Sequence, residues 1–443
     1  MTAVPPPHVA PVADSELDPR ALFFVSYEGL VNCASYQQSG LLTHLGWQYA
    51  AWYTETRHAV VARRRLPDGA WERTVLPHQL HADDSHNTIS LGVSAVDGRL
   101  HVAMDTHDNP VFYTCSPPGA VTDPGRYPLR FGPVERTVGG VDLGGISYPR
   151  FLATPEGWLQ LSYRTGRSGN GTQELAELTG RGWSALGRWS SATGGYRNGN
   201  GSSVRRNLYL HGLRYGPGGR LHAAFTWRED DASVLSAKGG LANHDTGYVY
   251  SDDRGRSWRG EGGKLVAVTG ADLLVAVDSP GLVVDPLGVD HALINQECLA
   301  LDSAGQPHVV LSHTPGGVTD YVADRRAYGR VFHLYRDGDG RWHKAEVPVP
   351  LDAFGRSQLV FDAADNAYLV LPYGRVVTAS AAQRWTDWTP RFDGAGLDAF
   401  GEVLVDGARL TAGRGILSVL YQRRSTGREP SAVRVADFAV DAG

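Results

Sequence analysis

The sequence predicts an all-β protein, a seven-bladed β-propeller of four-stranded antiparallel blades, with six blades as the alternative count. Three observations support this: a strand phrase that recurs along the chain, a glycine turn leading to an aromatic residue, and the composition. The 443 residues include 54 Gly, 25 Pro, 11 Trp and 19 Tyr. Many turns and many aromatic residues favour numerous short strands over long helices.

The first phrase is a turn followed by alternating apolar residues, the period-two pattern of a strand. It occurs as DGRLHVAM, EGWLQLSY, GGRLHAAF, AGQPHVVL and, more weakly, ADNAYLVL. Most of these phrases begin about sixty residues apart, a period typical of repeated supersecondary units such as propeller blades. The histidines inside the phrases, His101, His222 and His308, are therefore expected to pack between repeats.

The second phrase is a glycine turn that leads to a tryptophan, and it ends at Trp71, Trp183, Trp258 and Trp342. One copy, SDDRGRSW over residues 251–258, fits the Asp-box pattern Ser-x-Asp-x-Gly-x-Ser-Trp of propeller hairpins. Its aspartate can bond turn amides and its glycine permits positive φ. We expect it to stabilise a hairpin and to have no part in a functional site.

The domain prediction is a flexible, Pro-rich segment over residues 1–20 followed by a single propeller domain over residues 21–443. The N-terminus lacks a basic segment followed by an apolar run, so neither a signal peptide nor a transmembrane helix is expected. As it stands the chain would act inside the cell, or outside it if a leader has been removed. No membrane partner is expected.

Charge and cysteine content exclude several classes of function. The net charge of −5 and the absence of a basic stripe argue against a nucleic-acid partner. The three cysteines, Cys33, Cys115 and Cys298, have neither CxxC nor CxC spacing. A disulfide framework and a thiolate zinc site are therefore not expected, and no metal ligands are assigned.

Polar residues at the ends of successive inner strands are the candidates for a site, because propellers bind ligands on the loops at one end of the channel. His86 precedes a strand in DDSHN, and His107 follows one in DTHDNP. Tyr148 lies in ISYPRF, and Arg164 follows a strand in LSYRTG. We assign these four as catalytic. Expected substrate contacts are Asn87, Arg150, Trp227 and Arg228.

Two imidazoles, a phenol and a guanidinium suit β-elimination on a uronic acid. The C5 proton is weakly acidic because the adjacent carboxylate resists a carbanion. An enzyme must neutralise that carboxylate, remove the proton and protonate the leaving oxygen at C4. Arginine matches a carboxylate, and histidine and tyrosine cover the proton transfers.

Each of these residues also has a structural interpretation. His86 and His107 could cap turns through the neighbouring Asp and Asn residues, and Tyr148, before Pro149, could be a packing aromatic. Arg164 could pair with a surface acid, which contributes little energy. The conjunction of all four favours a functional site.

The chain resembles the BNR-4 repeat family over roughly residues 24–310. The resemblance is carried by the stretches GWQYAAWYTETRHAVVARRRLPDGAW, DDSHNTISLGVSAVDGRLHVAMDTHDNPVFY, YPRFLATPEGWLQLSYRTGRSGNG, GRLHAAFTWRED and LINQECLALDSAGQPHVVL. The family comprises seven-bladed propellers that include ulvan lyases and L-rhamnose-α-1,4-D-glucuronate lyases. The resemblance implies cleavage of a rhamnose–uronate linkage, in an oligo- or polysaccharide containing glucuronate or iduronate, to give an unsaturated uronyl product.

The resemblance also implies roles for the candidate residues. Two histidines from adjacent loops, a tyrosine and an arginine sixteen residues further on match His86, His107, Tyr148 and Arg164. Arg164 would neutralise the carboxylate with help from His86. His107 and Tyr148 would share proton abstraction and delivery, in either order. The closely spaced cysteines of the zinc site in some ulvan lyases are missing near Cys298, and no cofactor is required. A structural calcium ion is compatible with a propeller, although no acidic loop has ligand spacing.

Two other classes of function compete with a lyase. A glycoside hydrolase, rhamnosidase-like or sialidase-like, would need two carboxylates, for which Asp83, Asp84 and Glu229 are candidates. The Asp-box is shared with sialidases, but their arginine-containing start motif is not found. A non-catalytic glycan-binding propeller is the third class, and in it His86 or His107 could be replaced without loss of binding.

Overall fold

The computed structural model describes residues 6–237, 239–411 and 415–441. The fold is all-β, and every pairing between its named strands is antiparallel. The chain forms two compact units. Unit 1 contains residues 1–143, 148–159 and 357–443, and unit 2 contains residues 144–147 and 160–356.

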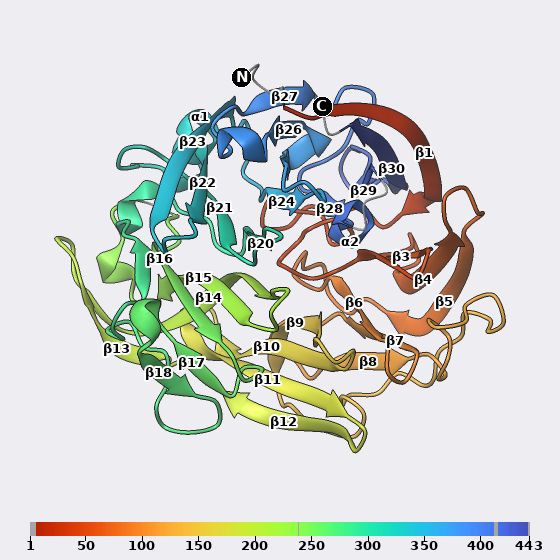
Figure 1. The fold of residues 1–443 in the computed structure, drawn as a ribbon, viewed down its shortest axis with the longest axis horizontal. Coiled ribbons are helices and arrows are strands. Elements are labelled where there is room, and N and C mark those ends of the chain that lie inside the picture. The colour runs from red at the N-terminus through yellow and green to blue at the C-terminus, as the bar shows by residue number, and fades with distance from the viewer. Residues whose placement is uncertain (1–5, 238, 412–414, 442–443) are drawn as a thin grey trace. The chain divides into compact units, whose positions relative to one another are not determined.

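Unit 1 contains four sheets (Figure 1). The first joins both ends of the chain in the order β1 (His8–Ala21), β30 (Ser431–Asp441), β29 (Ile416–Gln422) and β28 (Leu404–Val405). The second is β2 (Leu41–His44), β3 (Trp47–Tyr53), β4 (His58–Arg65) and β5 (Glu72–Gln79). The third is β6 (Ile89–Ser94), β7 (Arg99–Met104) and β8 (Phe112–Cys115). The fourth is β24 (Gln358–Phe361), β25 (Ala367–Val370), β26 (Val376–Ala379) and β27 (Thr389–Phe392).

Unit 2 contains three groups of paired strands, and the chain passes between the units in β9 (Ile146–Ala153). One group is β10 (Leu159–Arg167), β11 (Asn170–Thr179) and β12 (Gly182–Arg188). The largest runs from β13 (Thr193–Arg197) through β14 (Ser202–Tyr215), β15 (Leu221–Glu229), β16 (Asn243–Ser251) and β17 (Ser257–Arg259) to β18 (Leu265–Val268), with β19 (Val283–Asp285) on β16. The last is β20 (Cys298–Leu301), β21 (Pro307–His313), β22 (Arg330–Arg336) and β23 (Trp342–Pro350).

Helices are few and short. They are α1 (Tyr321–Tyr328), α2 (Gly407–Thr411) and the 3-10 turns η1 (Ala232–Val234), η2 (Glu261–Gly263), η3 (Val289–His291), η4 (Pro372–Gly374) and η5 (Ala381–Gln383). Among the described residues, no helix has the length and apolar character needed to cross a membrane.

The recurring phrases correspond to strands. The five copies of the first phrase fall on β7, β10, β15, β21 and β25. In the sheets that begin at β6, β20 and β24, this strand is the second one. His101 and His222 are buried, and each ring Nδ1 lies 2.7 Å from a tyrosine hydroxyl one strand away, Tyr113 and Tyr248 respectively. The packing role predicted for these two histidines is confirmed.

The Asp-box forms the predicted hairpin between β16 and β17. Asp253 accepts hydrogen bonds from the backbone N–H and hydroxyl of Ser257, at 2.8 and 2.6 Å, and Gly255 has a φ of +78°. Trp258 is fully buried and its ring stacks on Trp189 at 4.4 Å. These bonds confirm the predicted hairpin.

The N-terminal segment differs from the prediction. Residues 1–20 were expected to be flexible, but His8–Ala21 form β1, which pairs with β30 from His8 opposite Asp441 to Ala21 opposite Ser431. The Pro-rich composition gave no indication of this strand, because its partner strand lies more than 400 residues away in the sequence. Residues 1–5 lie outside the described part of the chain.

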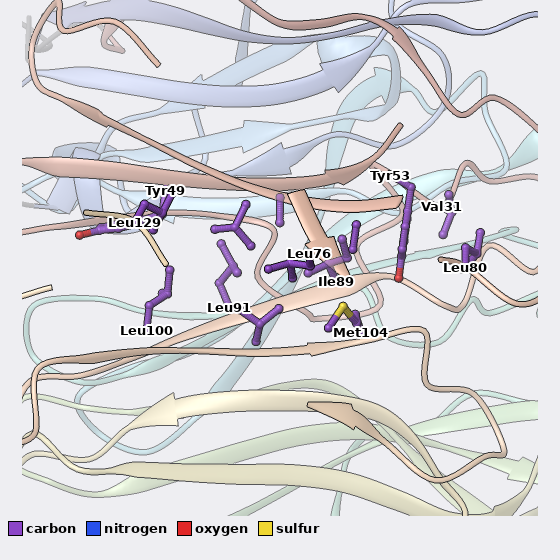
Figure 2. Packing of buried hydrophobic residues seen from close by; sticks show 14 of the residues in the cluster. Val31, Tyr49, Tyr53, Leu76, Leu80, Ile89, Leu91, Leu100, Met104 and Leu129 are labelled. Atoms are coloured by element: carbon purple, nitrogen blue, oxygen red, sulfur yellow. The ribbon is translucent and has the colours of Figure 1, made fainter. Parts of the chain in front are cut away.

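One hydrophobic core cluster of unit 1 lies between its second and third sheets. Figure 2 shows Leu91 of β6 and Leu100 and Met104 of β7 in one cluster with Tyr49 and Tyr53 of β3. All five side chains are at most 1% exposed. Burying a large apolar side chain contributes roughly 1.5–3 kcal/mol, so this cluster holds the two sheets face to face.

A buried ion cluster connects the sheet of β1 and β30 to its neighbours. Asp437 of β30 accepts from Arg64 of β4 at 2.7 Å and from Arg409 of α2 at 2.6 Å. Each of these side chains is about 5% exposed or less. The hydroxyl of Ser418 in β29 adds a third bond to Asp437 at 2.7 Å. The cluster therefore joins strands from both ends of the chain.

Removing Asp437 should destabilise the protein strongly, because both guanidiniums would stay buried without a counter-charge. We expect Asp437→Ala to lower the free energy of unfolding by about 3–5 kcal/mol. Urea denaturation followed by tryptophan fluorescence measures this. The matched control is Asp398→Ala, whose exposed pair with Arg424 at 3.8 Å should contribute little. Equal losses in both variants would contradict the interpretation.

Candidate active site

Asp84 connects the two predicted catalytic histidines in unit 1. Its Oδ1 lies 2.5 Å from Nδ1 of His86, and its Oδ2 lies 2.9 Å from Nδ1 of His107. The imidazole rings stack at a centroid distance of 4.3 Å and an angle of 14°. His86 lies in the loop before β6 and His107 in the loop after β7, and these strands are hydrogen-bonded neighbours. The strand pairing therefore brings the two loops together.

The carboxylate of Asp84 is held ionised. Burial would raise its pKa, but hydrogen bonds from His107 and His86 and the charge of His86 outweigh burial and hold the pKa well below its ordinary value. A carboxylate on Nδ1 fixes the orientation of an imidazole and directs Nε2 away from it. In its neutral form His107 therefore carries the lone pair on Nε2, which can accept a proton.

Aromatic rings surround the histidines. Tyr36 stacks on His86 at 4.6 Å, and Tyr27, which is 68% exposed, meets the same ring edge-on at 4.5 Å. The ring of Tyr148 lies 5.4 Å from that of His107 and 5.9 Å from that of His86. Three of the four predicted catalytic residues are thus together in unit 1.

The backbone at Tyr148 is strained. Its φ is +56°, although it is a bulky residue inside β9 and precedes a proline. Left-handed conformations at such residues cost of order 1–3 kcal/mol and are concentrated at functional sites. A residue with ordinary strand dihedrals would direct its side chain to another side of β9, so the strain positions the phenol.

Arg164 lies in unit 2 and is fully buried. Its guanidinium donates to the hydroxyl of Ser147 at 2.7 Å and to that of Tyr209 at 3.3 Å. Ser147 immediately precedes Tyr148 in the chain. Arg164 therefore does not have the surface position that its structural interpretation assumed.

Tyr209 is a site residue that the sequence did not reveal. Burial would raise its pKa, but the charges of Arg228 and Arg164 and hydrogen bonds from Ser168 and Asn207 outweigh burial and lower it. The Arg228 guanidinium lies 5.6 Å from the centre of the Tyr209 ring. A tyrosine with a lowered pKa is a candidate for acid–base chemistry.

The four predicted substrate-contacting residues differ in exposure. Trp227 is fully buried and packs edge-on against Phe225 at 5.3 Å, so the prediction that it contacts substrate is wrong for this conformation. Its position in β15 directs it into the core. Asn87 is 1% exposed and Arg150 is 7% exposed, which limits both to contacts at the base of a site. Arg228 is partly exposed.

One group of described residues could hold a metal ion, although none was predicted. The ligand atoms of Asp84, His86 and His107 lie within 4.8 Å of one another. Two imidazole nitrogens and one carboxylate suit a zinc-like ion better than calcium, which prefers oxygen ligands. The expectation of a structural calcium ion stays a prediction. The two hydrogen bonds to Asp84 satisfy the same atoms without a metal.

Asp84 and Tyr36 show what sequence reasoning missed. Asp84 was named above only as a candidate hydrolase carboxylate; in the structure it forms a turn, because its Oδ1 accepts from the backbone N–H of His86 at 2.9 Å. Its second role, on His107, depends on a residue 23 positions away. Tyr36 belongs to no repeat phrase, so no sequence signal distinguished it.

The sequence model of the BNR repeat-containing family matches residues 47–349. The chain belongs to this family. The BNR-repeat protein is also 26% identical over 381 residues to the long isoform of ulvan lyase from Alteromonas sp., an alignment that covers 74% of the chain. The chain spans 36% of the length of that relative.

Solved structures share the all-β fold of this BNR-repeat protein. Polysaccharide lyase Uly1 superimposes with a TM-score of 0.72 at 17% identity, over 97% of this chain and 99% of that one. An ulvan lyase bound to -[GlcA(1-4)Rha3S]- gives a TM-score of 0.64 at 13% identity, over 96% and 95% of the two chains. A lectin from Burkholderia pseudomallei gives 0.53 at 12% identity, over 92% and 97%.

The lowered pKa of Asp84 makes folding stability dependent on pH. A carboxyl whose folded pKa is depressed stabilises the fold above its unfolded pKa, about 3.9, and that stability is lost as pH falls toward the folded pKa. We expect Asp84→Asn to flatten the decline in unfolding free energy between about pH 5 and pH 3. Urea titrations across this range measure it. Asp272→Asn, at a fully exposed carboxylate, is the control. If the unfolding free energy of Asp84→Asn and of wild type declined identically with falling pH, the interpretation would be contradicted.

Proposed function

We propose that this protein is a carbon–oxygen lyase that cleaves a rhamnose–uronate linkage by β-elimination. The arrangement that carries the proposal is the pair of stacked histidines on Asp84 beside the strained Tyr148. The named activity of the Alteromonas relative supports it, and so does the saccharide bound by the ulvan lyase of similar fold. We further propose that the seven sheets are seven blades of a propeller.

The proton transfers are assigned to His107 and Tyr148. One of them removes the C5 proton as the C4–C5 double bond forms, and the other protonates the C4 oxygen as the C4–O bond breaks. Asp84 would stabilise an imidazolium on His107, because its Oδ2 already accepts from Nδ1 at 2.9 Å. The product is an unsaturated uronyl residue.

Carboxylate neutralisation is assigned to Arg164, with His86 assisting. Arg164 is buried, so a substrate carboxylate would have to replace Ser147 or Tyr209 as its hydrogen-bond partner. The bond to Ser147 gives Arg164 a second role, because it fixes the residue before Tyr148. Arg164 is therefore also a positioning residue for the phenol.

The hydrolase alternative is less well supported, because its three candidate carboxylates are already engaged. Asp83 pairs with Arg57 and Arg428, and Asp84 is held by two histidines. Glu229 has no exposed surface and is bound by Arg206 at 2.6 Å and His244 at 3.0 Å. These partners lower its pKa against the effect of burial, so it is unsuited to act as a general acid.

Elimination is directly measurable, because the unsaturated uronyl product absorbs in the ultraviolet. We expect absorbance near 235 nm to rise when wild type is incubated with rhamnose–glucuronate glycans or ulvan. His107→Ala should lower the initial rate by about 10²–10⁴-fold through loss of a proton-transfer group. His8→Ala, at an exposed histidine of β1, is the control and should leave the rate unchanged.

Two other outcomes would overturn the proposal. New reducing ends without a rise in absorbance would establish hydrolysis. Binding of the glycans without either product, at equal affinity in wild type and His107→Ala, would establish a non-catalytic glycan-binding protein.

The two roles of Arg164 are separable by mutation. Ser147→Ala removes the hydroxyl that binds Arg164 but keeps the charge. We expect kcat to fall with little change in KM, because a 1 Å misplacement can cost about 10²-fold in rate. Arg164→Lys should raise KM as well, since lysine lacks the planar fork that matches a carboxylate. Steady-state kinetics at 235 nm, with circular dichroism to verify folding, test both. Indistinguishable kinetics of Ser147→Ala and wild type would contradict the positioning role.

A further inference from the structure

We infer that unit 2 contains a second saccharide-binding site, which takes a neutral sugar and is separate from the residues assigned to catalysis. The observation is a cavity of about 570 Å³ lined by turns of β14–β18 and β20–β22. This volume is within the roughly 300–1,000 Å³ typical of small-molecule sites. The inference does not depend on the proposed lyase activity.

The cavity lies at one end of β14 and β15, and Tyr209 with its neighbour Arg228 lies toward the other end. In the pairing of β14 with β15, Asn207 is opposite Arg228 at one end, and Tyr215 is opposite Leu221 at the other. The cavity is lined by Gly216 and His222, which adjoin that second end. None of the predicted site residues lines it.

The charges in the cavity are paired with one another. Arg220 meets Asp252 through two contacts of 2.7 and 3.1 Å. Arg336 meets Glu261 at 3.1 and 3.4 Å. Two guanidiniums and two carboxylates leave no net charge among these four groups. The lining therefore offers both donors and acceptors but no surplus charge for a phosphate or a carboxylate.

The remaining groups suit a polyhydroxylated ring. Tyr248 and Tyr250 line the cavity with their rings 6.4 Å apart, and Arg220 lies over the Tyr250 ring at 4.0 Å, so the uncovered parts of the two rings provide the apolar surface. Burial and the charge of Arg220 lower the pKa of His222 to about 4, so this imidazole is neutral at physiological pH. Its Nδ1 is already engaged by the Tyr248 hydroxyl at 2.7 Å, so Nε2 is the ring nitrogen left to pair with a sugar hydroxyl, which can act as donor or acceptor.

One of the glycines that line the cavity, Gly218, has space beside it for a side chain. A Cβ added at Gly218 meets no atom within 4 Å, and the residue is exposed and lines the cavity. A Cβ can therefore be introduced there without a clash, and a tryptophan at this position is the variant chosen to fill the cavity. Gly199, also in unit 2, is equally exposed and equally free of neighbours but does not line the cavity. It provides a matched control.

The test is saturation-transfer NMR on the full chain with L-rhamnose and D-galactose as neutral probes and D-glucuronate as the charged probe. We expect wild type, His107→Ala and Gly199→Trp to bind the neutral sugars alike. Gly218→Trp and Tyr250→Ala should weaken that binding at least about tenfold, while the rate at 235 nm stays unchanged.

Three results would overturn the inference. The first is that neither neutral sugar binds to wild type. The second is that binding survives in both cavity variants. The third is that binding is lost in His107→Ala alone, which would place the sugar at the catalytic histidines. Preferential binding of D-glucuronate in the cavity would refute the charge argument. If Gly218→Trp does not fold, as judged by circular dichroism, Tyr250→Ala decides. A failed elimination assay would leave these outcomes unaffected.

Discussion

Unit 1 depends on the pairing of β1 with β30, which brings the two ends of the chain into one sheet. Backbone hydrogen bonds close this pair, and Asp437 connects it to β4 and α2 through Arg64 and Arg409. A buried carboxylate between two guanidiniums tolerates little displacement, because each uncompensated charge would be costly. The pairing of β6 with β7, and with it the approach of the His86 and His107 loops, rests on the core that this unit encloses.

The candidate site contains a similar arrangement, in which one carboxylate lies between two basic side chains. Asp84 holds two imidazoles as Asp437 holds two guanidiniums, but here the rings are partly exposed. An ionised carboxylate between two histidines fixes their orientation and supports a positive charge on either ring. Rigid positioning of this kind is what proton transfer from a weakly acidic carbon requires.

Charged groups in unit 2 are distributed differently at the two ends of β14 and β15. Around Tyr209, two arginines lower a phenol pKa, which suits contact with a negatively charged group. In the cavity beyond Tyr215, the arginines are paired with carboxylates. This difference in charge predicts that a uronate binds near Tyr209 and that a neutral sugar binds in the cavity. Both sugars are components of one class of glycan.

The all-β class, the strand phrases and the Asp-box hairpin were predictable from the amino-acid sequence, and His86, His107 and Tyr148 stand as candidate site residues predicted from it. These follow from local patterns, because alternation, turns and motif spacing are properties of neighbouring residues. Tertiary structure decided what long-range contacts govern. It paired β1 with a strand more than 400 residues away, placed Asp84 between two histidines, buried Trp227 and brought Tyr209 to Arg164. None of these has a local signature, because each depends on strand pairing that the chain completes only when folded.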